Sequence, residues 1–211
     1  MDTVDQSALR RGALQLKRLR TLTDVVFAIV LWRCFFMLPR PDAAMLSIEE
    51  FRAYLAENGL ALVSIVVGVL LTIIYWVQNN SLSADLERTD FRHTALSIFQ
   101  IFFLLAFLQS LRLGVDVGAS PGTRLYESFT AALVGISGGW AWSYAIKNRR
   151  LLLDDVTDEE ARATSHTILA EPITALFTIP FAFIGPGLWE LAWLSYPVVV
   201  RILRRRQARA S

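Results

Sequence analysis

Residues 18–36 read RLRTLTDVVFAIVLWRCFF, an apolar run with Asp24 near one end and Arg33 well inside it. A segment of this kind fits a bilayer, because ~20 mostly apolar helical residues cross a hydrocarbon core of ~30 Å. A charge inside such a span is costly, and it usually has a partner or a functional role. Asp24 and Arg33 therefore pose the central question of this sequence.

The composition of the whole chain favours a membrane protein. Of its 211 residues 54% are hydrophobic and 19% are charged, and the mean hydropathy is +0.43. These values are too apolar for an ordinary soluble domain. The single cysteine, Cys34, excludes an intramolecular disulfide and a cysteine-based metal cluster. The first residues lack the apolar core and cleavage site of a signal peptide, so we expect the first apolar run to be a retained helix.

Six apolar segments predict an all-α fold of six membrane-spanning helices, because a span must satisfy its own backbone hydrogen bonds. Residues 1–21 would precede the first span, and residues 204–211 would form a basic cytoplasmic tail. The Gly-Pro-Gly sequence at 185–187 predicts a tight hairpin between the last two spans. The six expected spans are about 22–38, 60–77, 94–111, 128–146, 168–185 and 188–203.

Lys and Arg are distributed unevenly between the two ends of the predicted spans. One side has only Arg40, Arg52, Arg112 and Arg124. Because cytoplasmic loops carry an excess of Lys and Arg, both termini are predicted to be cytoplasmic. The basic side holds Arg10, Arg11, Lys17, Arg18, Arg20, Arg88, Arg92, Lys147, Arg149, Arg150, Arg162, Arg201, Arg204, Arg205, Arg206 and Arg209.

Two polar segments between the spans have their own helical patterns. Residues 40–59 carry apolar side chains at helical spacing, starting with Met45, which predicts a short amphipathic surface helix with Ser47 as a cap. Residues 154–160 read DDVTDEE, and Thr157 before three acidic residues predicts the N-terminus of the fifth helix. Clustered carboxylates in that segment also allow a divalent cation site as the sharper alternative.

Asp24 allows two interpretations by spacing alone. It lies within about two helical turns of Arg18 and Arg20, next to the hydroxyl of Thr23, so a local polar network would compensate its burial. It could equally be an N-terminal capping residue at the membrane interface. The spacing leaves both interpretations open.

The order of residues around Asp24 resembles a known signature. Arg18, three further residues and then Leu-Thr-Asp at 22–24, before the apolar run 25–29, is similar to the first helix of the transmembrane protein 175 family. That family comprises lysosomal potassium channels and prokaryotic relatives, and its signature has Phe-Ser-Asp where this chain has Leu-Thr-Asp. Residues 75–90 and 171–186 resemble, in order, the family's second and fifth helices with the segments that follow them.

The resemblance implies a passive potassium channel that assembles as a homotetramer in a bacterial plasma membrane, with the first helix of each subunit lining the pore. Carried over by position, Arg18, Thr23 and Asp24 would form a supporting network, and Ile29 would be the innermost constriction residue. The only implied ligand is the permeant monovalent ion, without a cofactor or a bound metal. The implied partners are other copies of the chain and membrane lipids, including anionic lipids at the basic C-terminus.

The chain departs from the family one turn above Ile29, where Trp32 and Arg33 replace small or apolar residues. Arg33 and Phe36 follow Ile29 at helical spacing and would continue the same stripe. Arginines around a narrow pore oppose a cation, since like charges ~4 Å apart cost ~4 kcal/mol at an effective dielectric of ~20. Rings of Arg instead favour anions.

Arg33 has two alternatives to facing the pore. It could extend its guanidinium to the outer membrane surface, or pair with an acidic residue. Trp32 could block the pathway or pack between helices. The acidic residues available for such a pair are Asp116, Glu127 and Glu190.

The sequence therefore favours a potassium channel and leaves two other functions open. One is a nonconducting or gated membrane scaffold whose pore is closed by Trp32 and Arg33, and the other is an anion-selective pore. An enzyme is not expected, because no catalytic constellation is recognisable. Nucleic-acid binding is not expected either, since the basic tail directly follows a span.

Overall fold

The computed structural model describes residues 2–40 and 47–207 of the chain. Within these residues the secondary structure is helical, and the predicted all-α class is confirmed. Two short 3-10 turns, η1 and η2, separate some of the helices. The elements are α1 (Asp2–Phe35), α2 (Ile48–Ala84), α3 (Phe91–Val117), α4 (Pro121–Ile146), η1 (Lys147–Arg149), α5 (Asp158–Ile168), α6 (Ala170–Ile184), α7 (Pro186–Ala192), η2 (Trp193–Ser195) and α8 (Tyr196–Gln207).

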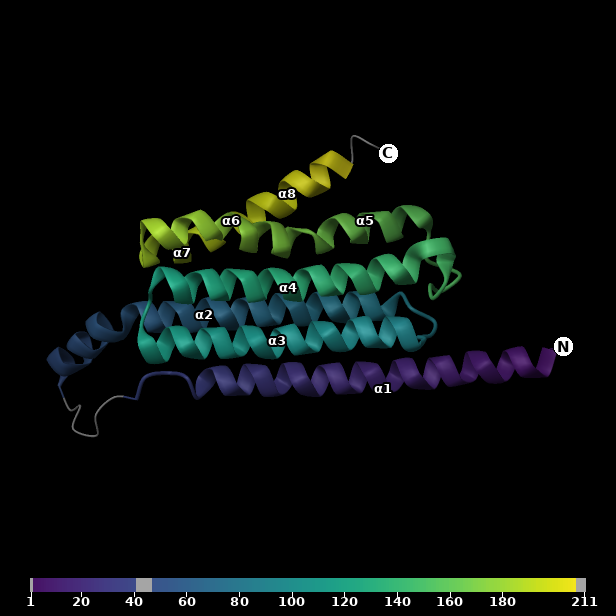
Figure 1. Cartoon of the computed structure of the whole chain (residues 1–211), viewed down its shortest axis with the longest axis horizontal. Coiled ribbons are helices and arrows are strands. Elements are labelled where there is room, and N and C mark those ends of the chain that lie inside the picture. Colours follow the sequence, from purple (N-terminus) through teal and green to yellow (C-terminus); the bar gives the residue numbers. More distant parts are fainter. Residues whose placement is uncertain (1, 41–46, 208–211) are drawn as a thin grey trace.

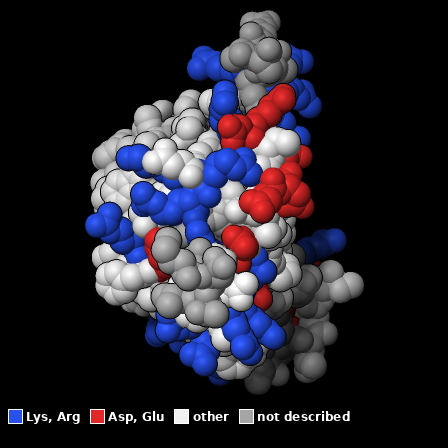
Figure 2. All heavy atoms as spheres, turned by 90° about the vertical axis from the view of Figure 1, so that its right-hand side faces the viewer, with Lys and Arg blue, Asp and Glu red and all other residues white. Residues whose placement is uncertain are grey.

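The long helices lie side by side in an elongated bundle (Figure 1). α4 packs against α3 and α6, whereas α1 contacts α2 and α3 and lies at one edge. The start of α1 and the two loops that connect α2 to α3 and α4 to α5 lie at the right-hand end of Figure 1, and α8 points toward that end. Seen from that end, Lys and Arg cover much of the surface beside a strip of acidic residues (Figure 2). We call this the basic end of the bundle.

Three stretches within the described residues are long and apolar enough to cross a membrane: α2, α3 and the region Asp158–Ile184. The chain is therefore an integral membrane protein. α1 carries four charged residues between positions 18 and 35, and α4 is rich in Gly and Ser. These compositions make both helices less apolar than α2 and α3, so six crossings stay a prediction.

The predicted hairpin after α6 is confirmed. α6 ends at Ile184, Gly185 is extended with φ 167°, and α7 begins at Pro186. The chain then turns back, so that α8 packs along α5 and α6. The expected single span 188–203 is nevertheless interrupted by η2, and α8 diverges from the bundle (Figure 1). Pro197 explains the interruption, since it cannot donate a backbone hydrogen bond to the preceding turn.

Other helix boundaries also differ from the predicted segments. α1 begins at Asp2 and runs through the expected N-terminal segment 1–21, and the predicted surface helix is continuous with α2. Met45, its first apolar residue, lies outside the described residues. The start of the expected basic tail, 204–207, belongs to α8. Because good helix formers fill these polar flanks, the helices continue beyond the apolar segments.

Both predicted helix caps are confirmed as capping boxes. The Ser47 hydroxyl accepts a hydrogen bond from the Glu50 backbone at 3.1 Å, and the Thr157 hydroxyl accepts one from the Glu160 backbone at 3.2 Å. In return, the Thr157 backbone N–H donates to the Glu160 carboxylate at 2.8 Å. Hydrogen bonds from the Thr157 backbone and hydroxyl lower the pKa of Glu160. The acidic segment thus caps α5, and the described residues contain no cluster of three potential metal ligands there or elsewhere.

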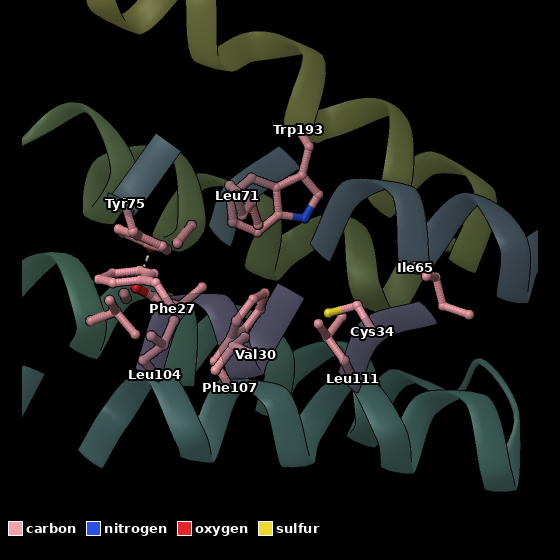
Figure 3. Packing of buried hydrophobic residues seen from close by; sticks show 14 of the residues in the cluster. Phe27, Val30, Cys34, Ile65, Leu71, Tyr75, Leu104, Phe107, Leu111 and Trp193 are labelled. Carbon is pink, nitrogen blue, oxygen red and sulfur yellow. Dashed lines mark hydrogen bonds between the residues drawn. The ribbon is translucent and has the colours of Figure 1, made fainter. Parts of the chain in front are cut away.

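Two apolar clusters form the core. In the larger one, Phe27, Val30 and Cys34 of α1 pack against α2 and α3 and lie near Trp193 of η2 (Figure 3). The smaller one lies at the basic end and includes Leu16, Leu82, Leu86, Trp142, Leu152 and Ile168. α4 approaches α6 closely at Gly135, where an added Cβ would lie 2.6 Å from the Pro172 ring. These contacts bury one side of α1 and leave its other side free.

Candidate pore-lining face and charged sites

α1 has one buried face and one exposed face. Its buried positions recur every three or four residues, from Leu16 through Thr23, Phe27 and Val30 to Cys34. Large apolar side chains recur at the same spacing on the opposite side, and about half of each side chain is exposed. This exposed face comprises Arg18, Leu22, Val25, Ile29, Trp32, Arg33 and, directly after α1, Phe36.

The four predicted constriction residues all lie on this exposed face. Ile29 is 49% exposed and Trp32 is 58% exposed. The rings of Trp32 and Phe36 contact each other, with centroids 4.5 Å apart, while Arg33 is exposed beside them. Within a single subunit these side chains are thus available to a shared pore, to lipid or to a second subunit.

The proposed acidic partners of Arg33 are all engaged by other arginines. The Asp116 Oδ2 atom lies 3.2 Å from Nε of Arg112. The Glu127 Oε2 atom lies 2.8 Å from Nη1 of Arg124, and the same guanidinium also pairs with Glu190. The interpretation that Arg33 pairs with one of these residues is therefore wrong for the subunit. No acidic residue in the described ranges forms an ion pair with Arg33, which leaves extension to the membrane surface and a pore-facing position.

Asp24 is not an N-terminal cap, because α1 begins far upstream of it at Asp2. Its Oδ1 atom instead accepts a hydrogen bond from the indole nitrogen of Trp76 in α2 at 3.0 Å. Thr23 is buried on the other face and donates to the Leu19 carbonyl at 2.8 Å. Arg18 is exposed. No hydrogen bond or ion pair joins Arg18, Thr23 and Asp24 to one another within the described subunit, so a network of the three stays a prediction about the assembly.

Arg20, which the sequence offered only as a neighbour of Asp24, connects α1 to the end of α2. Its guanidinium donates to the Ser83 carbonyl and, at 3.3 Å, to the Leu86 carbonyl. The last carbonyls of a helix lack intrahelical partners and attract cations. Arg20 therefore anchors the basic end of α1 to the C-terminus of α2.

A buried charged cluster lies near the other end of the bundle, and sequence reasoning missed it. Arg124 of α4 is 1% exposed, and its guanidinium contacts Glu127 and also Glu190 of α7. Ser64 of α2 accepts a further hydrogen bond from Arg124 at 2.6 Å, and the ring of Trp189 lies 4.6 Å from the guanidinium carbon. The cluster joins α2, α4 and α7.

The sequence contained a signal for this cluster. Arg124 and Glu127 are three residues apart in a helix, a spacing that places both side chains on one face. The assignment of Arg124 to a loop concealed this relation, because α4 begins at Pro121, before Arg124. Glu190 could not be joined to the pair without the fold, since it follows the hairpin.

A further buried carboxylate, outside this cluster, lies on α6. Glu171 is 1% exposed and accepts hydrogen bonds from Gln78 of α2 and from the Tyr196 hydroxyl of α8, each at 3.0 Å. Both of its oxygens therefore have donors. The two hydrogen bonds connect α6 to α2 and to α8.

Comparison with solved structures identifies the fold, whereas the two sequence comparisons found no match. No family model matches the sequence, and no curated protein is significantly similar to it. The structure is similar to that of a lysosomal potassium-selective channel TMEM175 homolog from Chamaesiphon minutus, with a TM-score of 0.69 and 16% identity over 92% of this chain and 98% of that one. It is also similar to a variant of the potassium channel MtTMEM175 bound to a nanobody fusion, with a TM-score of 0.60 and 14% identity over 91% and 93% of the two chains. The chain thus has the fold of the TMEM175 potassium-channel homologues.

Proposed function

We propose that the chain is a subunit of a TMEM175-type channel that passes monovalent cations, with potassium as the expected ion. Four copies would place the exposed face of α1 around a shared axis, and Ile29 would form the narrowest apolar ring. The observation that carries the proposal is that this face is continuous and uncovered in a subunit with the channel fold. We expect the protein to reside in a bacterial plasma membrane.

The charges on the exposed face favour a pore over lipid contact. Leu22, Val25 and Ile29 would be equally stable against lipid tails, but Arg33 would not be, because a charge in hydrocarbon costs several kcal/mol. A water-filled pathway hydrates the guanidinium at a lower cost. The excess of Lys and Arg at the basic end supports a cytoplasmic position for both termini.

The engagement of the acidic residues favours a second candidate function. With Asp116, Glu127 and Glu190 paired elsewhere, Arg33 has no acidic partner in the described subunit to neutralise it. Four such arginines around the axis would repel cations and attract anions. The second candidate is therefore a pore that is anion-selective, or one that Trp32 and Arg33 keep closed.

Ion flux in liposomes that contain the purified protein tests these functions. Potassium, sodium and chloride gradients are compared for the unmodified chain, Arg33→Leu and the control Arg52→Leu, which removes an exposed charge at the start of α2. Potassium flux in the unmodified chain supports the cation channel. Chloride flux that is lost only in Arg33→Leu supports the anion pore, and potassium flux that appears only in that variant supports the closed pathway. Absence of flux in all three proteins would contradict the channel proposal.

A further inference from the structure

The divergence of α8 opens a cleft at the side of the bundle. The cleft has a volume of about 650 Å³, within the range of small-molecule sites, and lies between α2, α5, α6 and α8. Its walls are mainly apolar, with Ile73, Val77 and Ile168 among the lining residues. The α8 side runs from Tyr196 to Arg204, and eight helical residues span ~12 Å, close to the thickness of one leaflet's hydrocarbon.

The accessible charge of this cleft is positive. Arg204 lines the end of the cleft that lies toward the basic end of the bundle, and it is exposed. No acidic residue in the described part of the chain pairs with Arg204. Glu171 also lines the cleft, but it is 1% exposed and both of its oxygens accept hydrogen bonds. A ligand would therefore meet a free guanidinium at the rim and a carboxylate that is already satisfied at depth.

We propose that this cleft binds one anionic phospholipid of the cytoplasmic leaflet. The phosphate would lie against Arg204, near the hydroxyls of Thr164 and Ser81, and an acyl chain would follow the wall formed by Ile73 and Val77. The arrangement matches the two parts of a lipid in order, with the cation at the membrane surface and the apolar wall below it. The proposal relies on the membrane placement given above and not on ion conduction.

Native mass spectrometry of the purified protein in detergent tests the proposal by counting retained lipids. Dioleoyl-phosphatidylglycerol is expected to bind at one molecule per subunit and more tightly than dioleoyl-phosphatidylcholine. Arg204→Gln should weaken phosphatidylglycerol binding roughly five-fold, the contribution of one basic residue near an anionic headgroup. Val77→Trp, which fills the wall without changing charge, should weaken it as well.

Arg206→Gln is the matched control, because it removes the same charge from the same turn of α8 but does not line the cleft. If Arg204→Gln and Arg206→Gln weaken phosphatidylglycerol binding equally, the lipid binds to a diffuse basic surface and not to this cleft. Equal competition by glycerol phosphate would identify a phosphate site without a lipid. A change of subunit number in Val77→Trp without any bound lipid would identify the cleft as a contact between copies. Lipid counting involves no ion flux, so this proposal and the channel proposal can fail independently.

Discussion

Two arginines, one in α1 and one in α4, have opposite surroundings in this subunit. Arg124 is almost fully buried and contacts two carboxylates, a hydroxyl and an indole ring. Arg33 lies on the free face of α1, beside Trp32, and all three acidic residues predicted as its partners are paired elsewhere. Both arginines would be costly in a membrane, but the fold compensates only Arg124.

We interpret this difference as one between a structural charge, Arg124, and a functional one, Arg33. The contacts of Arg124 join three helices, so its role can be explained within one subunit. The position of Arg33 has no explanation within one subunit. Its charge can be compensated only where water, an ion or another subunit contacts α1. The following predictions test this separation, beginning with the change that should cost the most stability.

Arg124→Leu should destabilise the protein by about 3–5 kcal/mol, because it leaves the Glu127 and Glu190 carboxylates buried without their cation. Chemical unfolding in detergent, followed by circular dichroism, measures the change. Arg112→Leu is the control, since it breaks an exposed ion pair with Asp116 that contributes only about 0–1 kcal/mol. Equal stability of the two variants would remove the distinction between the buried cluster and an ordinary surface pair.

Trp76→Phe should cost about 1 kcal/mol, because it removes the hydrogen bond to Asp24 and retains the aromatic ring. The loss should be measurable as a lower melting temperature in detergent. Trp140→Phe serves as the control, since Trp140 is 63% exposed at the end of α4. If both variants have the same melting temperature as the unmodified protein, the Asp24 carboxylate is stabilised by contacts between subunits rather than by Trp76.

Thr157→Ala should also cost about 1 kcal/mol by removing the N-cap of α5. The cap has a defined pH dependence through Glu160, whose pKa is lowered by hydrogen bonds from Thr157. A lowered pKa stabilises the fold above the ordinary glutamate value of about 4.3, and this contribution is lost as the pH falls through the folded-state pKa.

Melting temperatures of the unmodified protein and Glu160→Gln at about pH 7 and about pH 4 measure this dependence. The stability advantage of the unmodified chain over Glu160→Gln should be present at the higher pH and shrink at the lower one. An advantage that grows on acidification would contradict the assigned direction of the pKa shift. Glu159→Gln is the control, since it removes the neighbouring charge without entering the capping box.

The success of the sequence predictions follows from how local each feature is. The caps at Ser47 and Thr157 depend on residues within one helical turn, and the hairpin depends on a Gly-Pro-Gly sequence, so all three were predictable. The uncovered stripe through Ile29 follows from helical spacing on α1. Prediction of the Arg124 cluster would have required the relative positions of three helices. Prediction of the interruption in the last span would have required a comparison of the helix-breaking effect of Pro197 with the helical tendency of the apolar run around it.

Trp142 is a second case in which a local sequence pattern could not reveal a contact between helices. Its position near the end of a span is typical of an interfacial aromatic residue. The structure instead buries it at 2% exposure, where its indole nitrogen donates to the Ser165 hydroxyl at 3.0 Å. The contact depends on α5 folding back against α4, which no pattern within α4 could reveal.

Arg33→Leu should have the smallest effect on stability, within about 0.5 kcal/mol, because the side chain is exposed and makes no ion pair among the described residues. Its effect on ion flux should nevertheless be large, since it removes one positive charge per subunit from the face that we place at the pore. Unchanged unfolding together with changed flux or ion selectivity would identify Arg33 as a residue of the conduction pathway. Large destabilisation would instead show that Arg33 has a structural partner in the assembled protein, and the contrast with Arg124 would then disappear. Unchanged stability with unchanged flux would place Arg33 at the membrane surface, where its guanidinium is hydrated and distant from the permeant ion.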